Sequence, residues 1–345
     1  MTSESPDANG SQFDPYDKEK QLRAESNTWD TSAPEMALGS DIPVIDLAPY
    51  FSNPTATNLK STALQLQQAC EEVGFFSIVG HSVSSEQMQQ MFTAVRAFHN
   101  LPIESKRTLL MDRPDWPLGG VGYLPVKNRK LPTRDKGNLN EAFLVKRDHT
   151  IGMADNQWPS SADLPEFRQT VEAYGEAMED LGRKLMPLFA TALDMPSDYF
   201  EKAFEQPMYR LRMTHYPPTS SQVVDEFGIA PHVDTTFCTL LAQDQAGLTI
   251  YSERRQKWIK APLLENAFVV NSGELLRQWT NDRFLSVKHF ANNNTGDTSR
   301  YSIPFFLNAN SDYVMSCIPS CCGPDYPAKY PPISYAQSQA VAQGE

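Results

Sequence analysis

The second half of the chain alternates apolar and polar residues in short runs that are separated by polar turns. These runs occupy residues 210–218, 237–244, 247–251, 258–262 and 267–272. Alternation with a period of two is typical of strands with one buried face, and closely spaced short strands indicate an antiparallel sheet. We therefore predict a mainly β fold with flanking helices, whose core is a double-stranded β-helix, or cupin-like jelly roll, over about residues 206–335.

The first half of the chain carries apolar residues at helical spacing instead. The repeat is clearest in residues 57–73, 84–99 and 164–193. Each of these stretches is expected to form an amphipathic helix that packs on the sheet. Pro187 lies within the third stretch, so we expect that helix to be kinked or split there.

No linker or internal repeat interrupts residues 41–335, so residues 41–345 are predicted to form a single domain. Within it, residues 41–205 are expected to supply helices and a few strands ahead of the jelly-roll core. Residues 1–40 are rich in Ser, Asp, Glu, Asn and Pro and show no apolar period. They are predicted to form a flexible N-terminal arm.

The formal net charge is −12, from 42 acidic and 30 basic side chains. This balance argues against nucleic acid or an anionic membrane surface as a partner, because both bind clustered lysines and arginines. No apolar run approaches the roughly 20 residues needed to span a bilayer. The N-terminus also lacks the basic start and apolar stretch of a secretory signal, so we expect a cytoplasmic location.

Candidate chemistry begins at His232 and Asp234, which lie two positions apart and project from the same face of a strand. A metal ion held there needs a further ligand, and His289 is the only histidine C-terminal to this pair. Two histidines and one carboxylate leave coordination positions open, which is the arrangement of non-haem Fe(II) oxygenases. An H-x-D pair alone also occurs as an ordinary surface pair, so the pair by itself is weak support.

Arg300 and Ser302 follow His289 in another predicted strand, again at a spacing of two. Both side chains therefore project from one face of that strand. A planar guanidinium and a hydroxyl can together hold the carboxylate of a small acid. The alternative is an arginine in an ordinary salt bridge and a hydroxyl without a special role.

Taken together, these motifs resemble the isopenicillin N synthase-like branch of the Fe(II)/2-oxoglutarate-dependent dioxygenases. The resemblance extends from about Ile42 to about Tyr335. It includes Gly74–His81, which is similar to the family's G-F-F-x-(I/V)-x-(N/G)-H element. It also includes Arg300–Phe306, which is similar to the family's R-x-S-x-P-F-F.

The resemblance implies Fe(II), 2-oxoglutarate and O2 as cofactors. The implied iron ligands are His232, Asp234 and His289. The far carboxylate of 2-oxoglutarate is expected to contact Arg300, Ser302 and Tyr216. The expected lining of the substrate cavity is Tyr123, Phe143, Met213 and Phe305. His215, next to Tyr216, is expected to face the other side of its strand and is not counted as a ligand.

The function that this resemblance implies is oxidation of a small molecule by hydroxylation, desaturation or ring formation, in specialised metabolism. One alternative is an oxidase like isopenicillin N synthase, which uses Fe(II) and O2 without 2-oxoglutarate. In such an enzyme Arg300 and Ser302 would hold the substrate's carboxylate, and Gln343 could act as an extra ligand. A third hypothesis is a jelly-roll binding protein without turnover, which retention of all three metal ligands disfavours.

Overall fold

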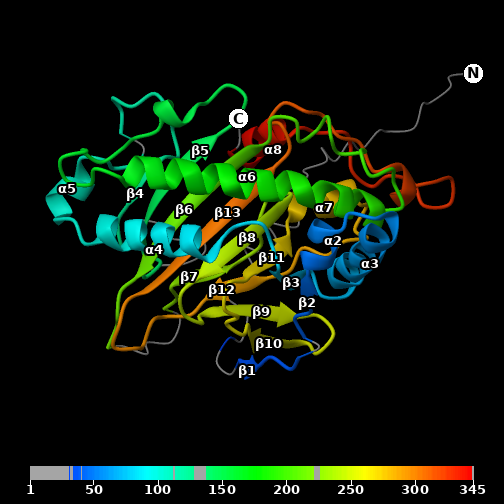
Figure 1. Ribbon diagram of the computed structural model, residues 1–345, viewed down its shortest axis with the longest axis horizontal. Helices are drawn as coiled ribbons and strands as arrows, with labels where there is room; N and C mark the ends of the chain where they lie inside the picture. Colours follow the sequence, from blue (N-terminus) through cyan, green and yellow to red (C-terminus); the bar gives the residue numbers. More distant parts are fainter. Residues whose placement is uncertain are drawn as a thin grey trace, which may run out of the picture.

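Two β-sheets face each other in the computed structural model, and the long helices cover the outer face of the larger sheet (Figure 1). The structure describes residues 31, 34–39, 41–111, 113–127, 137–220 and 226–343. The predicted jelly roll with flanking helices is confirmed. Most of the predicted arm, including residues 1–30, lies outside the described residues.

The larger sheet has eight strands, and strands from both halves of the chain contribute to it. In spatial order they are β2 (Val44–Asp46), β3 (Phe75–Val79), β11 (Phe268–Ser272), β8 (Cys238–Gln243), β13 (Arg300–Asn308), β6 (Met208–Tyr216), β5 (Glu141–Arg147) and β4 (Gly122–Leu124). Residues 41–205 and the jelly-roll segment are therefore joined in one sheet.

The smaller sheet has five strands. In spatial order they are β1 (Glu35–Met36), β10 (Lys257–Lys260), β9 (Leu248–Ser252), β12 (His289–Ala291) and β7 (Ile229–His232). Strand β1 corrects the predicted boundary of the arm. Its residues lie before residue 41 in the sequence and nevertheless pair with β10. Arg255 reinforces this junction, since its Nη1 donates to Asp41 at 2.6 Å.

The alternation in β13 decides what each face of the larger sheet contacts. Tyr301, Ile303 and Phe305 belong to the main hydrophobic core under the helices. Arg300 and Ser302 point the other way, into the space between the two sheets. A polar pocket can therefore lie directly behind a well-packed apolar core.

The long helices α3 (Ala56–Glu72), α4 (Ser85–His99) and α6 (Phe167–Ala192) cover the larger sheet (Figure 1). The short helices are α2 (Ala48–Ser52), α5 (Ile103–Arg107), α7 (Glu274–Trp279) and α8 (Tyr335–Gln343), with 3₁₀ turns η2 (Met153–Asp155) and η3 (Pro319–Cys321). Ser84 and Gln87 form a capping box at the start of α4, which satisfies backbone donors that the first turn leaves unpaired.

Of the two expectations for Pro187, a kink or a split, the split is wrong, because α6 continues through that residue as one helix. Proline inside a helix costs about 3 kcal/mol, since it removes a backbone hydrogen bond and crowds the preceding turn. Leu185, Leu188 and Phe189 beside it are fully buried against the core. We infer that this packing offsets the local cost.

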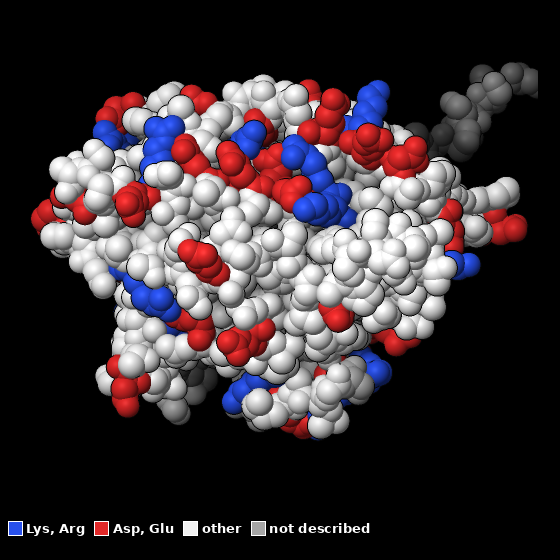
Figure 2. Space-filling model, in the orientation of Figure 1, with Lys and Arg blue, Asp and Glu red and all other residues white. Residues whose placement is uncertain are grey.

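Charged side chains of both signs are interspersed on the face that Figure 2 shows, which carries the long helices. Along α6 they form pairs such as Arg183 with Glu179, and Lys184 with Asp180 at 2.6 Å. Among the described helices, none has both the length and the apolar character needed to cross a membrane.

Candidate metal centre

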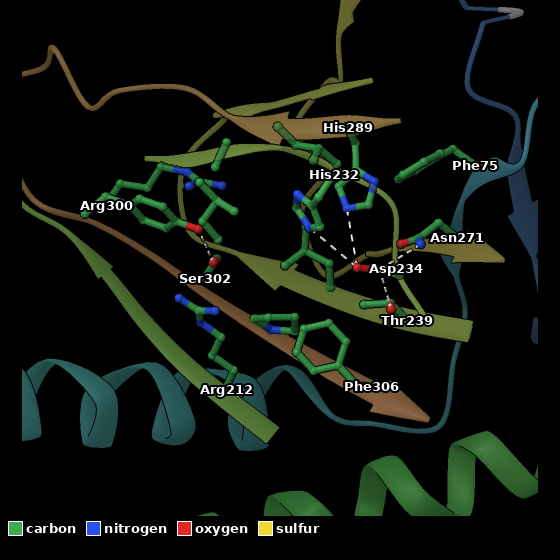
Figure 3. Close-up of a pocket in the computed structure, with 16 residues that line it drawn as sticks. Phe75, Arg212, His232, Asp234, Thr239, Asn271, His289, Arg300, Ser302 and Phe306 are labelled. Atoms are coloured by element: carbon green, nitrogen blue, oxygen red, sulfur yellow. Dashed lines mark hydrogen bonds and ion pairs between the residues drawn. The ribbon is translucent and has the colours of Figure 1, made fainter. Parts of the chain in front are cut away.

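Three side chains from the smaller sheet and its following loop converge at one point (Figure 3). His232 ends β7, and Asp234 follows it. His289 begins β12 and pairs there with His232. Asp234 Oδ1 lies 3.5 Å from His232 Nε2 and 3.6 Å from His289 Nε2. Atoms bound to one ion through bonds of about 2.1 Å are less than about 4.2 Å apart, so these atoms could share a single ion.

Both histidines are oriented by backbone carbonyls. His232 Nδ1 lies 2.9 Å from Ala230 O, and His289 Nδ1 lies 3.1 Å from Val287 O. A carbonyl only accepts, so each Nδ1 carries the proton and each Nε2 keeps its lone pair for the shared centre. Burial and the nearby His232 lower the pKa of His289 to about 4, which keeps this imidazole neutral at pH 7.

The carboxylate is oriented by neutral donors. Asp234 Oδ2 accepts from Thr239 Oγ1 at 2.6 Å and from Asn271 Nδ2 at 2.9 Å, which leaves Oδ1 for the centre. Burial opposes ionisation, but His289 and His232 and the Thr239 hydroxyl hold the pKa of Asp234 well below its usual range. Thr239 and Asn271 were not predicted from the sequence. The available signal was a polar residue on the pocket face of an otherwise apolar strand.

The second predicted group lies in the same pocket, where Arg300 and Tyr216 are cross-strand partners in β13 and β6. The Tyr216 hydroxyl lies 3.2 Å from Ser302 Oγ, and the Arg300 guanidinium lies 4.5 Å from the centre of the Tyr216 ring. Arg300 Nε donates to Gln245 O at 3.0 Å, and Nη2 donates to Gln243 Oε1 at 3.1 Å. Nη1 is buried and has no hydrogen-bond partner among the described residues.

An unpaired buried guanidinium nitrogen is costly unless a ligand completes its hydrogen bonds. A carboxylate is the complementary group, because its two oxygens match the planar fork of arginine. Arg300 lines the same pocket as His232, Asp234 and His289, which we call the metal triad.

The four predicted substrate contacts require correction. Tyr123, Phe143, Met213 and Phe305 are buried in the core under the helices and do not line this pocket. For β6 and β13 the error is one residue, because successive side chains point to opposite faces. Arg212 and Phe306, the immediate neighbours, face the pocket instead (Figure 3).

A jelly roll that presents two histidines and one carboxylate around open coordination positions defines the class of non-haem Fe(II) oxygenases. Residues 207–309 match the model of the 2OG-Fe(II) oxygenase superfamily. Residues 42–161 match the family described as non-haem dioxygenase in morphine synthesis N-terminal. The chain therefore belongs to the 2-oxoglutarate-Fe(II) oxygenase superfamily.

Similar proteins come from fungi and plants. The chain is 32% identical to the 2-oxoglutarate-Fe(II) type oxidoreductase hxnY of Emericella nidulans, over 85% of this chain and 86% of that protein. It is 33% identical to kihadalactone A synthase LFS of Citrus sinensis, over 86% and 90%. A Neurospora crassa protein, solved at full length with α-ketoglutarate and thymine, superposes with a TM-score of 0.77 at 25% identity, covering 88% of this chain and 97% of the Neurospora chain.

The protein is thus a 2-oxoglutarate-dependent dioxygenase that acts on a small molecule, and its cofactors are Fe(II), 2-oxoglutarate and O2. The donor set fits these groups, because neutral imidazoles and a carboxylate suit Fe(II) and the orphaned Arg300 nitrogen suits a carboxylate. These relatives favour the 2-oxoglutarate-dependent reaction over the oxidase alternative. Gln343 ends α8, and its side chain lies outside the described residues.

Proposed function

We propose that His232, Asp234 and His289 hold Fe(II), and that Arg300, Ser302 and Tyr216 hold the far carboxylate of 2-oxoglutarate. Bound Fe(II) supplies oxidising power for a substrate C–H bond as O2 is reduced and 2-oxoglutarate is converted to succinate and CO2. The observation that carries the proposal is the buried, unpaired Nη1 of Arg300 in the same pocket as the metal triad. We call Arg300, Ser302 and Tyr216 the carboxylate clamp.

The protein itself holds the metal ligands in position. The backbone carbonyls at Ala230 and Val287 hold the imidazoles, and Thr239 and Asn271 hold the carboxylate. A rigid ligand set keeps the metal in place and leaves the same coordination positions open in every turnover. Phe75, whose ring lies 5.2 Å from that of His289, covers one side of the centre with apolar surface.

The substrate side of the pocket combines apolar walls with one guanidinium. Ile229, Leu241 and Phe306 are among the apolar lining residues. Arg212 is held at the pocket by Thr214 Oγ1 at 3.2 Å and Asn140 Oδ1 at 2.8 Å. We propose that the substrate is a largely apolar small molecule with a carbonyl or carboxylate that accepts a hydrogen bond from Arg212.

The products of related enzymes support a role in specialised metabolism, since one relative is named for the synthesis of kihadalactone A and another, from Melia azedarach, for the synthesis of azadirone. Hydroxylation, desaturation and ring formation are all compatible with this proposal. A cytoplasmic location stays part of it, as predicted from the sequence.

The proposal is tested by anaerobic titration of 2-oxoglutarate into the Fe(II)-loaded protein, followed through the weak visible charge-transfer band of the chelate. Arg300→Ala should raise the Kd for 2-oxoglutarate about 10- to 100-fold, because a hydrogen-bonded charge pair contributes about 1.5–3 kcal/mol. Arg254→Ala is the matched control, since Arg254 forms a half-exposed ion pair with Asp41 outside the pocket.

Three other outcomes of this titration would contradict different parts of the proposal. A protein that binds Fe(II) but shows no band with 2-oxoglutarate would support the oxidase alternative. A protein that binds no iron would contradict the assignment of the metal triad. Equal Kd values for Arg300→Ala and Arg254→Ala would contradict the carboxylate clamp while leaving the metal centre intact.

A further inference from the structure

A second group of two histidines and one carboxylate lies on the helix-covered face of the larger sheet. Its members are His99 at the end of α4, Glu141 at the start of β5 and His215 in β6. One ligand atom from each residue lies within 4.8 Å of the others. We call this group the back cluster. Nothing in the proposed reaction uses it.

Glu141 is the centre of the back cluster and is supplied with donors from several elements. His215 Nδ1 donates to Oε1 at 2.7 Å, and Lys106 Nζ donates to Oε2 at 2.9 Å. The Tyr123 hydroxyl also donates to Oε2. The side chains of Glu141 and Lys106 are both 8% exposed, so the carboxylate and the ammonium neutralise each other inside the protein.

These contacts favour a hydrogen-bonded cluster over a metal site. His99 Nε2 donates to Met213 O at 3.1 Å. Its buried Nδ1 makes no hydrogen bond among the described residues, but it lies 3.4 Å from Glu141 Oε1. A nitrogen in that position would by itself suit an ion. The Lys106 ammonium already occupies the carboxylate, however, and a divalent cation beside it would be repelled in a medium of low dielectric.

The back cluster is connected to the carboxylate clamp through the backbone. His215 immediately precedes Tyr216, and its Nε2 lies 2.8 Å from Ser299 Oγ. Its ring stacks on Tyr301 with centroids 4.9 Å apart and planes 14° apart. Ser299 and Tyr301 flank Arg300 on both sides. The clamp and the His215 contacts are thus opposite faces of the same two backbone segments.

Tyr301 is itself anchored, so the ring that His215 contacts is well fixed. Its backbone nitrogen donates to Asp244 Oδ1 at 2.8 Å. Arg96 lies 5.5 Å from the centre of its ring and donates to Asp244 Oδ2 at 2.9 Å. Movement of β6 relative to β13 at this point would break the stack and the Ser299 contact together.

We propose that His215, held by Glu141, is a positioning residue for 2-oxoglutarate. It fixes Tyr216 and Arg300 from behind the sheet, so that the clamp has its binding geometry before the ligand arrives. Preorganisation of this kind strengthens binding because less order is lost when the ligand binds. The inference rests on the proposed role of the clamp, and it adds a residue that touches neither metal nor ligand.

The test compares His215→Leu, His215→Asn and the control His81→Leu. His81 is a suitable control, because its Nε2 contacts Asn266 O at 3.0 Å between the segment that follows β3 and the segment that precedes β11. For each variant we would measure iron stoichiometry, thermal unfolding, the anaerobic Kd for 2-oxoglutarate, and the KM for 2-oxoglutarate separately from kcat. Arg300→Ala is measured in the same series.

We expect His215→Leu to raise the Kd and KM for 2-oxoglutarate about tenfold, as loss of an outer supporting contact typically does, with iron stoichiometry unchanged and kcat largely kept at saturating 2-oxoglutarate. His215→Asn retains a donor for Glu141, so its Kd should lie between those of the wild type and the leucine variant. His81→Leu should leave the Kd unchanged, whatever it does to thermal stability.

A wild-type Kd in a folded His215→Leu protein, with a raised Kd in Arg300→Ala, would overturn the positioning role and leave the clamp intact. Wild-type Kd values in both variants would instead contradict the clamp itself. An asparagine variant no tighter than the leucine variant would assign the effect to lost packing and overturn the role of the Glu141 hydrogen bond. A second bound metal equivalent that His215→Leu removes would replace the hydrogen-bonded cluster with a metal site.

Discussion

The metal triad and the back cluster contain the same kinds of residue at similar separations, on opposite sides of the larger sheet. They differ in what else contacts the carboxylate. Among the described residues, the Asp234 carboxylate accepts hydrogen bonds from the neutral donors Thr239 and Asn271, both on Oδ2. Glu141 receives the Lys106 ammonium, which supplies the positive charge that a metal would otherwise bring. Neighbouring donors, more than ligand types, therefore decide which group can bind a metal.

The histidines show the same difference. In the triad, His232 and His289 both turn Nδ1 to a backbone carbonyl and leave Nε2 toward the centre. In the back cluster, His215 contacts Glu141 through Nδ1 and Ser299 through Nε2, so both of its ring nitrogens are occupied. The available lone pairs of His232 and His289 suit the proposed metal site, whereas the occupied nitrogens of His215 suit its proposed positioning role.

The largest expected effect separates the two groups directly. Asp234→Asn removes the only anionic ligand and should lower iron affinity by more than about 100-fold, beyond the 10- to 100-fold loss typical of outer contacts. The measurement is equilibrium dialysis against Fe(II) with a chromophoric chelator, and turnover of 2-oxoglutarate should fall with iron content. Glu141→Gln should keep its iron; loss of iron from both variants would end the distinction.

Glu141→Gln should instead cost stability. It leaves the Lys106 ammonium buried without a counter-charge, and breaking a buried ion pair in this way costs about 3–5 kcal/mol. The free energy of unfolding would be measured in urea. The double variant Glu141→Gln/Lys106→Met should recover part of the loss, because it removes the stranded charge. No recovery would mean that the pair is not the source of the cost.

Asn271→Ala tests the donors that distinguish Asp234 from Glu141. It removes one hydrogen bond to Asp234 Oδ2 and should lower iron affinity about 10- to 100-fold without removing a ligand. The same dialysis measures the effect. Asn58→Ala, which alters a hydrogen bond to Pro49 O near the start of α3, serves as the control. Unchanged iron affinity would show that the remaining Thr239 contact orients the carboxylate alone.

The smallest expected effect compares the two faces of β6. Arg212→Met, on the pocket face, should raise KM for an acid-bearing substrate about tenfold through loss of a charged hydrogen bond, with the Kd for 2-oxoglutarate unchanged. His215→Leu, on the other face, should raise the Kd for 2-oxoglutarate and leave the KM for the substrate unchanged. The measurement is steady-state kinetics with substrate and 2-oxoglutarate varied separately. A change in the Kd for 2-oxoglutarate in Arg212→Met would place Arg212 in the clamp.

Local sequence patterns were enough to predict the features that depend on residues close together in the sequence. The jelly roll followed from the alternating runs, and α4 from its apolar period. The spacing of two put Arg300 and Ser302 on one face of β13, and it kept Asp234 next to His232 although β7 ends at His232. The fold places both pairs in the same pocket. The split expected at Pro187 did not occur, because packing outweighed the local preference of proline.

The residues on the substrate side of the pocket could be identified only from the three-dimensional structure. Met213 and Phe305 were one position from Arg212 and Phe306, and a shift of one residue in a strand moves a side chain to the opposite face. Such a shift cannot be detected from polarity where both faces are buried, as in β6 and β13. Glu141 and His215 lie 74 residues apart in sequence, so their pairing depended on the register of β5 and β6.

The sequence by itself determined the family, the jelly roll, and which residues we propose for the metal and the clamp, because all of these depend on spacings of a few residues. The tertiary structure decided which face of each strand meets the pocket and which donors surround each carboxylate. It also decided that one histidine–carboxylate group has free ligand atoms while the other is neutralised by Lys106. Those outcomes depend on contacts between distant segments, which burial and strand register create only in the folded chain.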